Sequence, residues 1–123
     1  MARLQLYGTA SATGTSVAQV TIPATSRIRA IQADIMVDSN TDAAQVRLEL
    51  SKVPTNQIAT NGALDPIAEF AWAGNLATSG LGQGGINQQL AVDVPCRQGE
   101  IIYLHATVSG TATFYANFIL IYG

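Results

Sequence analysis

Apolar and polar residues alternate along most of this chain in short runs. The clearest run is QVRLELS at residues 45–51, where Val46, Leu48 and Leu50 alternate with polar or charged side chains. Side chains of a β-strand point to opposite faces in turn, so an alternation with period two predicts a strand with one buried face. On this basis the sequence predicts eight strands, at residues 3–7, 16–22, 27–37, 45–51, 67–72, 89–94, 100–108 and 112–122.

Turn-forming residues separate these runs, and no stretch has a helical period. Short turns are expected at 12–14, 23–26, 38–42, 96–99 and 109–111, and longer connections at 53–66 and 73–87. Many short strands joined in this way are typical of β-sandwiches and jelly rolls. A chain of 123 residues corresponds to one domain. We therefore expect an all-β fold, a single-domain antiparallel β-sandwich over residues 1–123, with about eight strands in a jelly roll and residues 1–15 as a candidate N-terminal arm.

One predicted strand contains a break in its alternation. In residues 27–37, Ile31, Ile35 and Val37 fall on one face, whereas Ile28 is out of phase with them. An extra residue in one strand of a pair shifts the phase in this way, so we expect a β-bulge near Ala30.

The low charge of the chain excludes some partners and favours others. Charged residues make up 11% of the sequence, compared with about 25% in an ordinary soluble domain. The six Lys and Arg residues form no basic stripe, which argues against nucleic-acid binding, and no apolar run approaches the ~18–20 residues of a membrane helix. Because a weakly charged surface repels its copies little, the composition favours a subunit that associates with neighbours; a weakly charged soluble monomer is the alternative.

Three glycines, Gly80, Gly82 and Gly85, form the spacing G-x-G-x-x-G. In dinucleotide-binding proteins this motif follows a strand and opens a helix, whose N-terminal N–H groups bind the pyrophosphate. The residues that follow here, INQQLAVDV, alternate with period two and predict a strand, so the helix is missing. The motif therefore predicts an irregular surface loop, and we expect this loop and the neighbouring Trp72 to act in docking rather than in nucleotide binding.

A second motif has the spacing of a calcium loop. Asp38, Asn40, Asp42 and Glu49 occupy its positions 1, 3, 5 and 12, where oxygen ligands converge on one cation. Position 6 calls for glycine and holds Ala43, and no helices are predicted on either side. The alternative is a hairpin turn in which Asp and Asn side chains bond their own backbone, and the missing glycine favours that turn.

Catalytic chemistry has little support in the sequence. Cys96 is the one thiol and His105 the one imidazole, so the chain cannot supply zinc with three or four such ligands. Nucleophilic catalysis would need the Cys96 thiol and the His105 imidazole next to each other, with a third group that orients them. No carboxylate pair has a spacing that points to a glycosidase, and we expect neither enzymatic activity nor a cofactor.

The last two predicted strands are apolar on both faces. A strand that is apolar on both sides is covered on both sides. In a sandwich one side faces the core, so we expect a second subunit on the other; cover by a long loop of the same chain is the alternative. The residues expected at the subunit interface are Tyr103, His105, Tyr115, Phe118, Leu120 and Tyr122.

The C-terminal segment, GEIIYLHATVSGTATFYANFILIYG, resembles the last hairpin of trimeric jelly rolls of the tumour-necrosis-factor and complement type. Those folds end in a Gly-acid-x-x-x-Leu strand, matched here by Gly99, Glu100 and Leu104, and then in an aromatic strand of F-x-x-F-x-L-x-Y character. The residues that approximate this second pattern are Tyr115, Phe118, Leu120 and Tyr122, with Tyr for the first Phe. The resemblance implies a homotrimer whose aromatic residues line the threefold axis.

Small size, low charge and abundance of Ala, Thr and Gly are also similar to those of tailed-phage virion proteins, among them capsid decoration or cement proteins. This resemblance implies a bacteriophage structural protein that is made in the host cytoplasm, lies on the capsid surface of the virion and bridges copies of the major capsid protein as a trimer. A single cysteine and no evident secretory signal agree with folding in a reducing cytoplasm. The alternative is a carbohydrate- or receptor-binding β-sandwich, such as a lectin or fibre tip, with Trp72 as its aromatic platform.

Overall fold

The computed structural model describes residues 2–39, 44–58, 66–74, 83–110 and 112–123, and this part of the chain forms eight strands and no helix. Every predicted strand is present, most of them longer than the alternation alone indicated. The strands are β1 (Ala2–Ala10), β2 (Gly14–Thr21), β3 (Ser26–Ser39), β4 (Ala44–Ser51), β5 (Ala68–Gly74), β6 (Gln83–Cys96), β7 (Ile101–Ser109) and β8 (Ala112–Tyr122).

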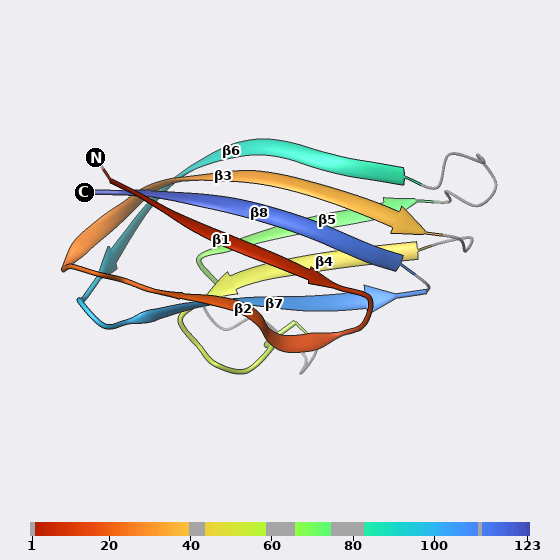
Figure 1. The fold of residues 1–123 in the computed structure, drawn as a ribbon, viewed down its shortest axis with the longest axis horizontal. Coiled ribbons are helices and arrows are strands. Elements are labelled where there is room, and N and C mark those ends of the chain that lie inside the picture. The colour runs from red at the N-terminus through yellow and green to blue at the C-terminus, as the bar shows by residue number, and fades with distance from the viewer. Residues whose placement is uncertain (1, 40–43, 59–65, 75–82, 111) are drawn as a thin grey trace.

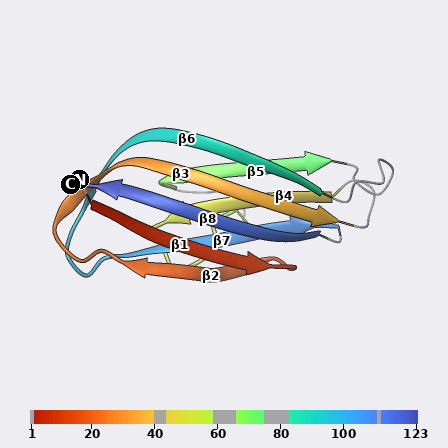
Figure 2. The same cartoon turned by 45° about the horizontal axis from the view of Figure 1, so that its top comes forward.

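The strands form two four-stranded antiparallel sheets that pack face to face (Figures 1 and 2). Sheet A has the order β1-β8-β3-β6, and sheet B has the order β2-β7-β4-β5. Successive strands alternate between the sheets except for β4 and β5, which are neighbours in sheet B, and the predicted all-β jelly-roll sandwich is confirmed.

The N-terminal segment is part of this sandwich. β1 pairs with β8 along its whole length, from Ala2 opposite Tyr122 to Ala10 opposite Phe114, and Gly14 already begins β2. The expectation of a projecting arm over residues 1–15 is wrong, because the backbone groups of β1 complete the edge of sheet A.

The irregularity predicted in the third strand is present. The register of β3 shifts between Ile28 and Ala30 against both of its neighbours, β6 and β8. Both isoleucines, Ile28 and Ile31, are consequently buried although their sequence phases differ. A bulge near Ala30 is therefore confirmed.

The core lies between the sheets and is built from the inward faces of the strands. Phe114, Phe118 and Leu120 of β8 are fully buried, and the ring of Phe118 lies 5.4 Å from that of Phe70 in β5. Burial of one such side chain contributes about 1.5–3 kcal/mol to stability. Phe118 and Leu120 thus belong to the core, and the prediction that they lie at a subunit interface is wrong.

The glycine motif is only partly described. Gly80 and Gly82 lie outside the described residues, whereas Gly85 is inside β6, opposite Met36 of β3. A Cβ atom at Gly85 would lie 2.7 Å from the carbonyl oxygen of Ile35, closer than any side chain tolerates. Gly85 is therefore a strand position where two backbones approach closely, and the prediction that it belongs to a loop is wrong.

Candidate functional site

The outward face of sheet A carries the most exposed large apolar side chains in the described part of the chain. Tyr7 of β1, Met36 of β3 and Tyr115 of β8 are 56%, 51% and 43% exposed. Met36 is the register partner of Tyr115, and Tyr7 is the register partner of Asn117, two residues along β8. The three side chains therefore share one region of one face, which we call the sheet A face.

Amide side chains occupy the rest of this region. Asp34 of β3 lies between Asn117 of β8 and Asn87 of β6, and the next row of the sheet places Gln32 beside Gln89. These side chains line a groove of about 310 Å³ together with Ile119. The Gln5 side-chain amide donates a hydrogen bond to Oδ1 of the Asn117 side chain at 2.8 Å. Asp34 is the one ionisable group in the groove lining, and Asp38 and Arg3 are exposed at outward positions further along β3 and β1.

The outward face of sheet B differs because its own chain covers part of it. Residues 52–58 follow β4, and Asn56 and Gln57 are buried against this sheet. Asn56 donates hydrogen bonds from Nδ2 to the carbonyl oxygens of Ala106, at 2.7 Å, and Gly14, at 3.1 Å. We call residues 52–58 the strap.

The strap explains why the alternation of β4 did not predict burial on its second face. Val46, Leu48 and Leu50 face the core as expected, but Glu49 and Ser51 are also fully buried. Ser51 Oγ accepts a hydrogen bond from the N–H of Val53, and Glu49 Oε1 accepts one from the N–H of Gln57. The polar face of β4 is therefore the floor on which the strap rests.

The six predicted interface residues lie in three different places. Phe118 and Leu120 are in the core, and Tyr122 is partly buried against it. His105 is fully buried on the outward face of sheet B, where Tyr103 stacks on its ring at 5.9 Å. Tyr115 is the one member of the set on the sheet A face. His105 is covered by a loop of the same chain, which was the alternative to a second subunit. The prediction that His105 lies at a subunit interface is therefore wrong.

The calcium loop is not assembled from its predicted ligands. Asp38 lies at the end of β3, whereas Glu49 is five residues into β4, about 16 Å from the start of that strand. Glu49 is buried under the strap and cannot reach a cation at the turn, so its assignment as a ligand is wrong. Asn40 and Asp42 lie outside the described residues. In the described ranges, no three His, Cys, Asp or Glu side chains gather as a metal site.

Trp72, Cys96 and His105 do not form a chemical site. Trp72 of β5 pairs with the buried Val46 and packs against the core, so it is not an exposed platform for a sugar. Cys96 is buried in sheet A, and this burial raises the pKa of its thiol, which keeps the thiol protonated. His105 lies in sheet B and is bound by other groups. Within the described residues, no nucleophile and base are brought together.

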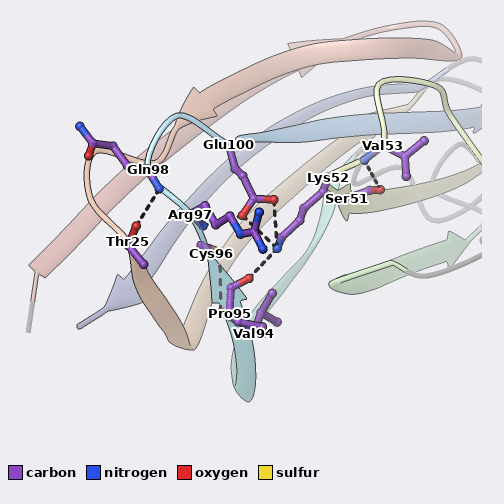
Figure 3. Close-up of polar contacts among 10 residues, drawn as sticks. All are labelled: Thr25, Ser51, Lys52, Val53, Val94, Pro95, Cys96, Arg97, Gln98 and Glu100. Carbon is purple, nitrogen blue, oxygen red and sulfur yellow. Dashed lines mark hydrogen bonds and ion pairs between the residues drawn. The ribbon is translucent and has the colours of Figure 1, made fainter.

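A pocket lies at one end of the sandwich, where Lys52 and Glu100 form an ion pair (Figure 3). It measures about 500 Å³ and is lined by Thr25, Ser26, Arg27, Lys52, Pro95, Cys96, Arg97 and Glu100. Lys52 Nζ lies 3.3 Å from Glu100 Oε2 and donates a hydrogen bond to the carbonyl oxygen of Pro95. Arg27 pairs with Asp93 at 2.6 Å. Because Lys52 and Arg27 already have carboxylate partners, we interpret this end as a structural junction and not as an anion site.

The same junction perturbs its carboxylates. The hydrogen bond from the Arg97 N–H, followed by Lys52, lowers the pKa of Glu100. The hydrogen bond from Arg27 lowers the pKa of Asp93. Both shifts favour the charged carboxylates and so stabilise the junction at neutral pH.

The sequence matches no family model and no curated protein. Solved structures nevertheless share the architecture. The Eiger tumour-necrosis-factor protein of S. frugiperda is 10% identical, with 96% of this chain and 90% of that chain covered and a TM-score of 0.51. A chain of the capsid of Helicobacter pylori bacteriophage KHP30 is 8% identical, with coverages of 98% and 89% and a TM-score of 0.47. A CBM36-1 domain of a xylanase from the hindgut metagenome of Trinervitermes trinervoides is 11% identical, with coverages of 99% and 97% and a TM-score of 0.49.

The strand order of the two sheets, together with the likeness to the Eiger chain, defines the class of fold, a jelly-roll β-sandwich. A fold of this kind fixes no single function. The described residues contain no helix long and apolar enough to cross a membrane.

Proposed function

We propose that this protein is a virion structural subunit that associates with copies of itself through the sheet A face, as a trimer by the resemblance of its C-terminal hairpin, and bridges neighbouring copies of a major capsid protein on the capsid surface. One observation carries the proposal. The sheet A face exposes Tyr7, Met36 and Tyr115 beside a groove lined mainly by amides, and no described segment of the chain covers it.

The composition of this face suits a protein interface. Tyrosine and methionine are enriched at the centres of interfaces, and charged residues are depleted there. Amide side chains such as Asn87, Asn117 and Gln32 carry both donors and acceptors. A surface of amides can therefore bond to its own copy, which supports a second copy of this chain as the occupant.

Light scattering coupled to size-exclusion chromatography tests self-association. We expect the wild-type protein to be an oligomer and Tyr115→Lys to be a monomer with an unchanged melting temperature, because Tyr115 projects out of the sandwich. Gln45→Lys is the matched control, since Gln45 is exposed on sheet B and its substitution adds the same charge. A wild-type monomer, or equal loss of association in both variants, contradicts the proposal.

Capsid binding is tested separately. Shells assembled from a candidate major capsid protein are sedimented with the purified protein. We expect saturable co-sedimentation at a fixed ratio to capsid subunits, and Tyr115→Lys to bind less because bridging requires the oligomer. Failure of the wild-type protein to co-sediment contradicts the capsid role and leaves self-association standing.

A glycan-binding module is the second candidate, on one specific observation. The groove of Gln32, Asp34, Asn87, Gln89 and Asn117 offers hydrogen-bonding groups beside two exposed tyrosines, the combination that sugar hydroxyls and sugar rings require. A monomeric wild-type protein that binds an oligosaccharide on an array, with binding lost in Asn87→Ala, would replace the structural proposal by this one.

A further inference from the structure

A buried polar layer lies between the strap and sheet B. Glu49 and Ser51 of β4 and His105 of β7 are fully buried there, although all three side chains point away from the core. Burial of a polar group lowers the free energy of unfolding unless the group has a hydrogen-bond partner. The pairing of these groups therefore decides how firmly the strap is held.

The hydrogen bonds of His105 fix its protonation state. The backbone N–H of Ser16 donates to Nδ1 at 2.9 Å, so Nδ1 carries no proton. The other ring nitrogen, Nε2, lies 2.7 Å from the carbonyl oxygen of Val53 and must donate its proton to it. The ring is thus a neutral imidazole that joins β7 to β2 on one side and to the strap on the other.

Ser16 adopts a backbone conformation that needs this support. Its φ is +53°, in the left-handed region that residues other than glycine rarely occupy. It lies in the part of β2 where the register against β7 shifts, between Gly14 and Ala18. The strap bonds to the same irregularity, because Asn56 donates to Thr15 Oγ1 from its backbone and to the Gly14 carbonyl oxygen from its side chain.

Glu49 offers His105 a second partner. It is the register partner of His105 on β4, and its Oε1 already accepts the N–H of Gln57. Its Oε2 is buried without a hydrogen-bond partner in the described structure. Since β2 and β4 flank β7 on opposite sides, a half-turn of the imidazole about its Cβ–Cγ bond moves Nδ1 from the Ser16 side toward the Glu49 side. The same half-turn puts Cε1 where Nε2 faced the Val53 carbonyl oxygen, so it also weakens the bond between the ring and the strap.

We infer that His105 is a pH-dependent latch for the strap. The neutral ring accepts the Ser16 N–H and holds the β2 irregularity and the strap in place. An imidazolium has no acceptor, so protonation breaks this bond and directs Nδ1–H to Glu49 Oε2. The strained Ser16 then relaxes, and the strap loses the backbone to which Asn56 is bonded.

The other ionisable groups near the ring do not oppose this change of hydrogen-bond partner from Ser16 to Glu49. Tyr103 stacks on the ring from β7 itself, with the ring centroids 5.9 Å apart. On the neighbouring strands, Arg47 of β4 pairs with Glu69 of β5 at 3.8 Å. Lys52, at the start of the strap, pairs with Glu100. Of the ionisable groups that the structure describes around the ring, Glu49 is the one placed to accept a hydrogen bond from Nδ1–H.

Hydrogen exchange measured by NMR tests the latch. Protection factors, corrected for the intrinsic effect of pH, are followed at Ser16, Asn56 and Gln57 from about pH 7.5 to about pH 5. We expect these three amides to lose protection together, at least several-fold, while amides of β8 in sheet A keep theirs. At neutral pH the imidazole ¹⁵N shifts should report a protonated Nε2.

Two variants separate the latch from a merely structural histidine. His105→Gln keeps one acceptor and one donor but does not titrate, so we expect its protection to be independent of pH in this range. Glu49→Gln removes the acceptor of the protonated ring, so we expect the loss of protection to move to lower pH. The inference is overturned by a pH-independent wild type, by an unchanged pH step in His105→Gln, or by a neutral ring protonated at Nδ1. If His105→Gln does not fold, an unchanged midpoint in Glu49→Gln overturns it alone.

Discussion

The outward faces of the two sheets start from similar sequence patterns, but on sheet A large outward side chains are exposed and on sheet B outward side chains are buried. On sheet A, the outward residues of β8 and β3 include Tyr115 and Met36, and both side chains are exposed. On sheet B, the outward residues of β4 and β7 include Glu49 and His105, and both are fully buried. Polar and ionisable groups are thus buried on the outward face of sheet B, whereas apolar groups are exposed on the outward face of sheet A.

The comparison shows what a covering segment must provide. The strap buries polar groups, and it does so by supplying hydrogen-bond partners such as the Asn56 amide and the Val53 carbonyl. The sheet A face offers exposed apolar area beside its amides, a combination that suits another folded surface. A chain can cover a polar face with its own loop and keep an apolar face for a partner.

The largest expected effect distinguishes the inward from the outward side of β8. Phe118→Ala should lower the free energy of unfolding by about 3–5 kcal/mol, because it leaves a cavity in the core. Tyr115→Ala, three residues away and outward, should change it by less than about 1 kcal/mol. Urea unfolding of both variants measures the difference, and equal destabilisation would contradict the assignment of Phe118 to the core.

The next effect compares one amide on each face. Asn56→Ala should cost about 2–3 kcal/mol, because it leaves the carbonyl oxygens of Ala106 and Gly14 without their donors under the strap. Asn117→Ala, on the sheet A face, should cost about 0.5 kcal/mol or less, because water replaces its exposed bond to Gln5. Similar melting temperatures for the two variants would show that the strap contributes little to stability.

A smaller effect concerns association through the sheet A face. Asp34 lies among amides and would be buried without a cation in an oligomer. Removing this charge with Asp34→Asn should lower the dissociation constant about fivefold, or about 1 kcal/mol. Sedimentation velocity at several concentrations measures it. Glu69→Gln removes the same charge from sheet B, and an equal effect there would point to net charge instead of the face.

The smallest effect concerns the junction at the end of the sandwich, which belongs to neither face. The pKa of Glu100 is lowered below its ordinary value of 4.5, so its carboxylate stabilises the fold above that pH, and this contribution is lost as the pH falls through the lowered pKa. Because the group is partly exposed, we expect less than about 1 kcal/mol. Glu100→Gln should therefore flatten the fall of the melting temperature below pH 4.5, and an unchanged slope would assign that fall to other carboxylates.

Local sequence patterns predicted the fold well because the strands have one face that must be apolar. Alternation identified the eight strands and the broken phase at Ile28 located a bulge. The length of β6 was underestimated because its first residues, QGGIN, alternate poorly, and Gly85 was therefore assigned to a loop. That glycine is required by the approach of the Ile35 carbonyl, a contact between strands that are far apart in sequence.

It was harder to predict which face of each strand is buried, because this depends on covering segments that are far away in the chain. The pattern of β8 is apolar on both sides and does not show which side is the core, so Phe118 and Leu120 were placed at an interface. The burial of Glu49 and His105 depends on the strap, which is polar and looked like an exposed connection. A signal was nevertheless present: a buried polar floor needs amide donors, and the strap contains Asn56 and Gln57.

The pairing of β1 with β8 has a consequence for how the chain reaches its fold. Ala2 lies opposite Tyr122, so residues near the two ends of this sequence are neighbours on adjacent strands (Figure 1). Closing sheet A requires the most distant segments of the sequence to meet, which slows folding. A circular permutant that joins the ends by a short turn and opens the chain elsewhere converts this contact into a local hairpin. Such a permutant should fold faster to the same sandwich, and it would free a new pair of termini for attaching cargo.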